Sequence, residues 1–186
     1  NHGIYEGEIF EGFNVPHGFG TYKATTGLYK GDKYVGEWNM NKYDGKGTYT
    51  STEGWVCEGY FKDHKRHGQV RIIDKDGSSY VGEYKDDKKH GVGTQIYSNG
   101  DKYEGGWYEN TFFGQGTQTT KIYTYIGKFR NDKRQGTGKL ILISGDVYEG
   151  KFDDNVFVEG TLTLKSGEVW EGTWSDTELV EGKKIK

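Results

Sequence analysis

Short runs of alternating residues recur along the chain, each built from a ring, a glycine and a second ring. Three clear examples are Tyr34 to Trp38, Tyr80 to Tyr84 and Tyr103 to Trp107. In an extended strand, residues two positions apart share a face, so both rings and the glycine between them point to the same side. The alternation therefore predicts short β-strands that each carry one aromatic face.

The motif repeats at a nearly constant spacing. The first step is 29 residues long, and the later steps are 22 or 23 residues long. Such a period is typical of proteins in which each repeat packs only on its neighbours. We expect residues 1–186 to form a single domain of repeats that start near residues 5, 34, 57, 80, 103, 125, 148 and 170.

A second glycine motif follows about ten residues after most leading rings, as in His90-Gly91-Val92-Gly93. A further turn motif, such as Asn99-Gly100, precedes the next ring motif. Polar residues followed by glycine are typical of tight turns between antiparallel strands. The chain is therefore predicted to be all-β: an elongated single-layer antiparallel meander of about eight two-stranded hairpin repeats.

These motifs resemble the MORN (membrane occupation and recognition nexus) repeat, a Tyr-Glu-Gly-Glu-Trp strand followed by a His-Gly-x-Gly strand. Residues 80–84, 90–93 and 148–152 match this pattern most closely. The resemblance covers nearly the whole chain and departs from the pattern at Cys57, at Val70 and in the last two copies, which lack the first glycine. It implies curved β-rods that act as scaffolds, dimerise, join membranes to the cytoskeleton, or flank catalytic domains.

From this resemblance we expect a non-enzymatic scaffold or adaptor that mediates protein–protein interaction, with a role in linking cytoskeletal or axonemal structures, as in a cilium, to membrane. A homodimer is compatible with the pattern. Two alternatives stay open: a peripheral membrane adaptor that binds acidic phospholipids, and a regulatory repeat segment of a larger enzyme.

Composition indicates what the core is made of. Hydrophobic residues are 32% of the chain, aromatic residues are 16% and glycines number 31. Because this hydrophobic fraction is low for a globular core, rings packed over glycines are expected to provide much of it. A single-layer sheet also leaves room for a groove that accepts an apolar helix or an extended peptide. The rings predicted to line this groove are Trp38, Tyr84, Trp107, Phe129, Phe152 and Trp174.

Basic residues recur eight and nine positions after the leading rings, at what we predict to be turns along one edge. Several such residues near an anionic surface would attract acidic lipid or an acidic partner weakly, although neighbouring aspartates oppose this attraction. In two repeats the apolar residues Phe112, Phe113, Val156 and Phe157 lie at or beside these positions, and they either insert into a partner or fold back. The basic edge consists of Lys42, Lys65, Arg66, Lys88, Lys89, Lys133 and Arg134.

Other classes of function find little support in the sequence. Five histidines and the single Cys57 invite a metal site, but four convergent ligands are not evident, so we expect no metal and no cofactor. Glutamates recur beside the leading rings, where cross-strand pairing is favoured over a basic partner. The net charge of −3 gives no reason to expect nucleic acid. With no apolar stretch of transmembrane length, a cytoplasmic chain associated with cytoskeleton or membrane is expected.

Overall fold

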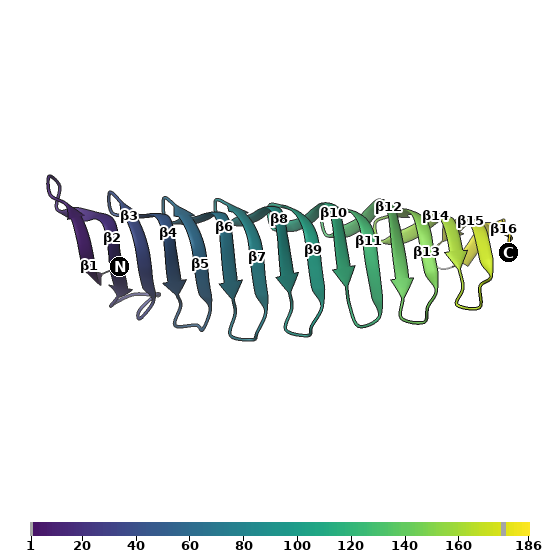
Figure 1. Ribbon diagram of the computed structural model, residues 1–186, viewed down its shortest axis with the longest axis horizontal. Coiled ribbons are helices and arrows are strands. Elements are labelled where there is room, and N and C mark those ends of the chain that lie inside the picture. Colours follow the sequence, from purple (N-terminus) through teal and green to yellow (C-terminus); the bar gives the residue numbers. More distant parts are fainter. Residues whose placement is uncertain (1, 176–177) are drawn as a thin grey trace. The chain divides into compact units, whose positions relative to one another are not determined.

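The computed structural model describes residues 2–175 and 178–186 and is all-β (Figure 1). The described residues contain no helix, and therefore none that could cross a membrane. The predicted antiparallel meander of two-stranded hairpins is confirmed. The chain divides into two compact units, residues 1–98 and 99–186. The expectation of one domain over residues 1–186 stays a prediction.

Each unit contains eight strands that pair in sequence order with antiparallel neighbours (Figure 1). Unit 1 contains β1 (Gly3–Phe10), β2 (Val15–Ala24), β3 (Lys33–Asn39), β4 (Lys42–Thr50), β5 (Val56–Lys62), β6 (Lys65–Ile73), β7 (Ser79–Lys85) and β8 (Lys88–Ile96). Unit 2 contains β9 (Lys102–Tyr108), β10 (Thr111–Thr119), β11 (Tyr123–Arg130), β12 (Lys133–Leu142), β13 (Val147–Asp153), β14 (Val156–Thr163), β15 (Val169–Ser175) and β16 (Glu178–Lys184).

Glycines form a row across the strands of each unit. Gly36 pairs with Gly20 on one side and Gly47 on the other, and Gly138 pairs with Gly127 and Gly150. In five repeats the leading tyrosine lies over the two glycines of its own hairpin, and its hydroxyl donates to the carbonyl three residues ahead; these tyrosines are Tyr5, Tyr34, Tyr80, Tyr103 and Tyr125. Tyr34, for example, donates to the Glu37 carbonyl oxygen at 3.0 Å. The predicted packing of rings over glycines is therefore present.

The two glycines of the second motif have different roles. In β8, Gly91 has a φ of 61°, a left-handed conformation, and lies where the pairing with β7 shifts register. Gly93 carries no such φ but supports the Tyr80 ring, because a Cβ there would lie 2.3 Å from the Tyr80 hydroxyl oxygen. The first glycine thus adopts the backbone conformation that the β-bulge requires, and the second leaves room for the ring.

The aromatic core is a chain of edge-to-face contacts. Tyr34 meets Trp38 of its own repeat at 5.5 Å and Phe61 of the next repeat at 5.3 Å between ring centroids. Tyr125 has the same relation to Phe129 and Phe152, both at 5.0 Å. Tyr34 and Tyr125 therefore each join two successive repeats, and such aromatic pairs add about 0.5–1.5 kcal/mol each beyond the area they bury.

The six hairpin turns from β3–β4 to β13–β14 each contain two residues that both have positive φ. Asp86 and Asp87 have φ of 49° and 68°, and Asp154 and Asn155 have φ of 47° and 77°. This pattern is typical of type I′ turns, whose twist matches that of the strands, and aspartate and asparagine tolerate it well. The first hairpin departs from the pattern, because the four residues 11–14 connect β1 to β2.

Candidate functional site

The six rings predicted to line a partner groove are all buried, with exposed fractions between 2% and 6%. Their positions agree with the alternative that they form the core. A partner can reach them only where the side chains above them leave a cavity. These rings are Trp38, Tyr84, Trp107, Phe129, Phe152 and Trp174.

From the second repeat to the seventh, the residue nine positions after the leading position packs on the core rings. Phe112 stacks on Tyr103 at 3.6 Å, and Tyr43 stacks on Tyr34 at 3.8 Å. In other repeats a cation takes this place: the guanidinium carbon of Arg66 lies 4.7 Å from the centre of the Tyr84 ring. Lys89 lies over Tyr80 and Arg134 lies over Tyr125 in the same way, with Tyr123 and Phe152 also near Arg134.

The prediction that the basic residues lie in turns is wrong. The turns precede them, so Lys42, Lys65, Lys88 and Lys133 begin β4, β6, β8 and β12. Since side chains alternate along a strand, the residues at the eighth position are exposed, whereas Arg66, Lys89 and Arg134 at the ninth position face the core and are half-buried. The seven cations do not share one edge.

Ion pairs neutralise part of the exposed row. Lys42 Nζ lies 2.6 Å from Asp63, and Lys133 Nζ lies 2.6 Å from Asp154, in each case an acid in the turn of the next repeat. The hydrogen bond between Lys42 and Asp63 raises the pKa of Lys42 and lowers the pKa of Asp63. An anionic surface would therefore have to compete with aspartates for these two ammonium groups.

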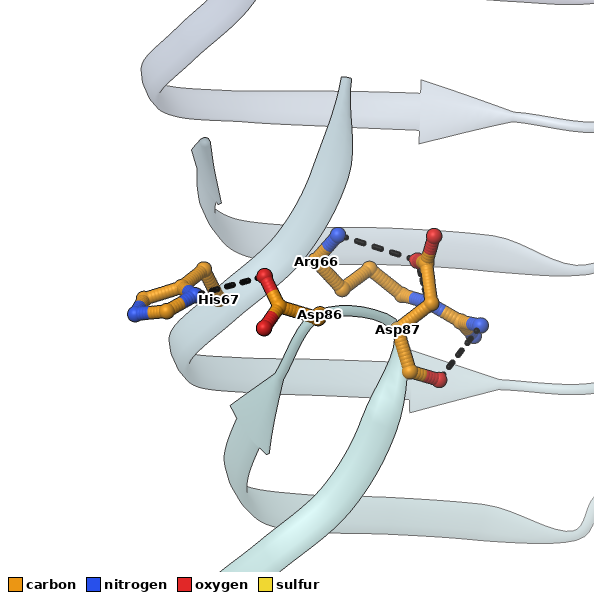
Figure 2. Close-up of polar contacts among 4 residues, drawn as sticks. All are labelled: Arg66, His67, Asp86 and Asp87. Atoms are coloured by element: carbon orange, nitrogen blue, oxygen red, sulfur yellow. Dashed lines mark hydrogen bonds and ion pairs between the residues drawn. The ribbon is translucent and has the colours of Figure 1, made fainter. Parts of the chain in front are cut away.

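The turn between β7 and β8 is bonded to the repeat before it (Figure 2). Asp87 accepts hydrogen bonds from the backbone N–H of Arg66 at 3.0 Å and from its Nε at 2.9 Å, while the Arg66 Nη2 donates to the Asp87 carbonyl at 3.2 Å. The Asp87 N–H donates to the Arg66 carbonyl at 3.1 Å. Beside it, His67 Nδ1 lies 3.7 Å from the Asp86 carboxylate.

The same connection recurs in other repeats. Asp132 accepts from the Phe112 N–H at 2.8 Å, and Asn155 accepts from the Arg134 N–H at 2.8 Å. Each of these turn residues also donates its own N–H to the carbonyl of the residue that it holds. The second turn residue of one repeat therefore fixes the ninth residue of the preceding repeat.

The apolar residues expected at the predicted turns lie partly in the core and partly in solvent. Phe112 and Phe157 fold back and are buried, whereas Phe113 is exposed. On the opposite face of the sheets, Glu58 lies 3.7 Å from Arg71 and Glu149 lies 3.1 Å from Lys139, and both pairs are direct cross-strand partners. These contacts support cross-strand pairing for the glutamates concerned.

A cavity of about 770 Å³ opens among β1 to β4 of unit 1. Its walls are mainly aromatic, and it lies beside the connection between β2 and β3, residues 25–32, which supplies Tyr29 and Asp32. Trp38 is the only one of the six predicted groove rings that lines it. The residues around it are His2, Gly3, Tyr5, Pro16, Tyr22, Ala24, Tyr29, Asp32, Trp38, Asn41, Tyr43, Tyr49 and His64.

Asp32 supplies negative charge to this cavity although it is only 5% exposed. Its carboxylate accepts hydrogen bonds from the Thr52 N–H and hydroxyl, both at 2.8 Å, and from the Tyr49 hydroxyl. Burial opposes ionisation of this group, but these hydrogen bonds outweigh it and lower the pKa of Asp32. The carboxylate is therefore ionised at neutral pH.

Two other polar groups of the cavity, Tyr43 and His64, are uncharged at neutral pH. Burial raises the pKa of Tyr43, and the nearby Tyr22 and Asp32 raise it further. Burial, followed by the charge of Lys42, lowers the pKa of His64, although Asp63 opposes the shift. The cavity thus combines ring walls, phenol hydroxyls and one carboxylate.

Four of the cavity residues, Tyr22, Tyr29, Asp32 and Tyr49, were not predicted from the sequence. The longer first step of the repeat was the feature that could have indicated them.

Metal binding finds no site among the described residues, where no cluster of three or more histidine, cysteine, aspartate or glutamate side chains could hold an ion. Cys57 is fully buried in place of a leading ring, and burial raises its thiol pKa to about 12. This thiol is therefore protonated at neutral pH and is a poor nucleophile.

A family model for the MORN repeat matches residues 5–29, 34–56, 57–78, 80–102, 103–121 and 125–147. These segments cover most of the chain. The chain is a MORN-repeat protein. The hairpins β13–β14 and β15–β16 extend the same architecture beyond the matched segments, and the β13–β14 hairpin shifts register by fewer residues where its first glycine is missing. The MORN repeat is a non-catalytic repeat module.

Curated relatives share part of this array. The chain is 39% identical over 66 residues to Alsin of Rattus norvegicus, 37% over 67 residues to Alsin of Mus musculus and 36% over 67 residues to Alsin of Homo sapiens. Each match covers about a third of this chain, 34–35%, and only 4% of the length of Alsin. MORN repeats in a much longer protein suggest a repeat-containing interaction or adaptor module.

Proposed function

We propose that this MORN-repeat chain is a non-enzymatic interaction module that holds a protein partner, and that unit 1 contacts the partner at the ring-lined cavity. The observation that carries the proposal is the cavity itself, because at about 770 Å³ it is much larger than the ring-lined cavities of about 240 Å³ and 230 Å³ in other repeats. Buried aromatic anchors dominate the energetics of protein interfaces, and a cavity of this size accepts a side chain of a partner.

The alternative of a membrane adaptor has less support in the geometry. The basic row that would contact acidic phospholipid is divided between two faces, and aspartates of neighbouring repeats pair with Lys42 and Lys133. Exposed charges of opposite sign that lie this close largely cancel at physiological ionic strength. We therefore favour a protein over a lipid surface as the partner.

Salt and lipid composition separate the two functions. Tagged protein is incubated with lysate of its source cells and, in parallel, with liposomes that contain acidic phosphoinositides, at low and at high salt. We expect a specific protein to be retained at high salt and no sedimentation with liposomes. Sedimentation that persists at physiological salt, without a salt-resistant protein partner, would contradict the proposal and support the membrane adaptor.

The narrower expectations belong to the same proposal. A cytoplasmic module that links cytoskeletal or axonemal structures to membrane should retain tubulin- or actin-associated proteins in this experiment. Retention of only a second copy of the chain would instead identify the homodimer as its interaction, and light scattering across a concentration series tests this directly.

A further inference from the structure

The large cavity of unit 1 differs from the smaller ring-lined cavities in its charged groups. A cavity of about 240 Å³ in the same unit is lined by Arg66 and Lys89, and one of about 230 Å³ in unit 2 is lined by Arg134. The 770 Å³ cavity is lined by no lysine or arginine. Tyr43 is the ninth-position residue at its wall, and Pro16, which pairs with Ile9 as Tyr43 pairs with Trp38, lies at the corresponding place in the first hairpin. Here a carboxylate is present without a cation.

Within the chain, the ring surfaces already bind the guanidinium groups of two arginine side chains. The guanidinium carbon of Arg134 lies 5.4 Å, 5.6 Å and 5.7 Å from the centres of the Tyr123, Tyr125 and Phe152 rings. Arg66 lies 4.7 Å from the Tyr84 ring. A cation within about 6 Å of a ring centre is attracted by the electrons of the ring face, most strongly where water is excluded. The repeat architecture therefore builds cation sites from aromatic walls.

The large cavity has the same kind of walls and, in addition, the charge to hold a cation. Trp38 meets Tyr5 at 5.0 Å and Tyr43 at 4.8 Å edge to face, and Tyr43 in turn meets Tyr49 at 6.5 Å, so these four rings form a connected wall. The carboxylate of Asp32 is ionised, lines the cavity and accepts a hydrogen bond from the Tyr49 hydroxyl, and the neutral imidazole of His64 does not oppose a positive ligand.

We propose that this cavity binds the guanidinium group of an arginine side chain that a protein partner presents. The bound arginine supplies to the rings of this cavity the guanidinium that Arg66 and Arg134 supply to the rings of later repeats. Arginine fits better than lysine because its planar group stacks on rings and donates to a carboxylate at the same time. The inference rests on the proposed function, since it names the chemistry of the partner that the module holds.

A capped Gly-Arg-Gly peptide is the probe, titrated into the full chain by calorimetry. The matched control peptide contains citrulline, which keeps the shape of arginine but not its charge. We expect the arginine peptide to bind with a Kd on the order of 1 mM and the citrulline peptide at least about ten-fold more weakly. Absent binding, or equal binding of the two peptides, overturns the inference.

A variant that fills the cavity from within gives the sharper test. Tyr43→Arg places a guanidinium at the ninth position, where two other repeats already tolerate one, and should reduce arginine-peptide binding by at least about ten-fold. Tyr60→Arg is the matched control, because Tyr60 is 52% exposed on a strand of the same unit, does not line the cavity, and undergoes the same change in charge. Equal loss in both variants would contradict a site in the cavity.

A second variant protects the test against misfolding of the first. Asp32→Asn removes the negative charge and keeps the shape of the side chain, so it should weaken the arginine peptide by about ten-fold and leave the citrulline peptide unchanged. Circular dichroism and thermal melting establish that each variant is folded. Arginine-peptide binding that is unaffected by Asp32→Asn contradicts the role of the carboxylate and overturns the proposed site.

The outcomes separate this inference from the proposed function. If the arginine peptide fails to bind while the salt-resistant protein partner is still captured, the module holds its partner elsewhere and only the inference is wrong. If choline binds as tightly as the arginine peptide, the cavity is a site for small organic cations and the inference of a protein side chain is overturned.

Discussion

Tyr80 shows how a single ring depends on the absence of side chains beneath it. The ring is 2% exposed, its hydroxyl donates to the Glu83 carbonyl at 3.1 Å, and Gly82 and Gly93 lie under it. A Cβ on Gly93 would lie 2.3 Å from the hydroxyl oxygen and 2.6 Å from the ring carbon that carries it. Because the ring is enclosed, it cannot move aside without opening the repeat.

Replacement of this glycine should therefore be costly. We expect Gly93→Ala to lower the free energy of unfolding by about 2–4 kcal/mol, through overpacking of the core. Gly12→Ala is the control, because a Cβ there would contact only the exposed Phe10 ring, at 3.3 Å, and should change stability by less than about 0.5 kcal/mol. Urea denaturation measures both, and equal midpoints would contradict the role assigned to Gly93.

Asp32 makes a prediction about pH at the same scale. Its pKa is lowered in the folded chain from the ordinary value of 3.8, so its contribution to stability is present above that value and is lost as pH falls through the folded pKa. Asp32→Asn should cost about 1–2 kcal/mol at pH 7. The difference between the wild-type chain and the variant should shrink below about pH 4. A difference that stays constant down to pH 2 in denaturation curves would show that the carboxylate is not ionised in the fold.

At the scale of elements, the turn between β7 and β8 joins one hairpin to the next through Asp87. Its carboxylate accepts the Arg66 N–H and holds the guanidinium over the Tyr84 ring. Its φ of 68° adds a backbone requirement that alanine meets poorly and asparagine meets well. The two contributions can be separated by substitution.

Asp87→Ala removes both the acceptor and the tolerance of left-handed backbone, so we expect it to lower the free energy of unfolding by about 2–3 kcal/mol. Asp87→Asn keeps an acceptor oxygen and the backbone preference and should cost less than about 1 kcal/mol, as Asn155 already performs this role. Chemical denaturation ranks the variants. Should alanine and asparagine be equally destabilising, the charge of the carboxylate would be the dominant contribution instead.

The strands were largely predictable from the sequence, because a strand with one buried face alternates between core-facing and solvent-facing residues. The ring–glycine–ring runs place β3, β7 and β9, and the fixed spacing gives their order. The orientation of the basic residues was not predicted correctly, because the turns were placed one or two residues too late. The aspartates and asparagines before them, such as Asp86 and Asp87, favour the left-handed turn conformation and were the available indication.

The cavity was not predictable in the same way. Its walls come from β1 to β4 and from the connection 25–32, and a cavity depends on how side chains distant in sequence fill space. The first step of 29 residues signals extra chain but does not say that Tyr29 and Asp32 lie beside Tyr22 and Tyr49. The neighbours of the core rings, in contrast, could be predicted from the sequence, because the repeat determines them.

At the scale of the whole molecule, the architecture limits how far stability is shared. Within each unit a strand pairs only with the strands before and after it in sequence, so each repeat depends on its nearest neighbours. The first and last strands have fewer such supports: β1 and β16 are exposed along almost their whole length, whereas β3 and β7 each contain three buried residues, two rings and the glycine between them. In a protein that consists of residues 1–186 alone, local opening should therefore be cheapest at β1 and β16.

Hydrogen exchange measured by mass spectrometry tests this distribution of stability. We expect amides of β1 and β16 to exchange at least about ten-fold faster than those of β3 to β7, because fraying there breaks only one strand pairing and exposes little buried surface. The pH dependence of the rates establishes that opening is at equilibrium, and Gly93→Ala should accelerate exchange most in β7 and β8. Equal protection across all the described strands would show instead that the repeats open as one cooperative unit, and the independence of neighbouring repeats would have to be abandoned.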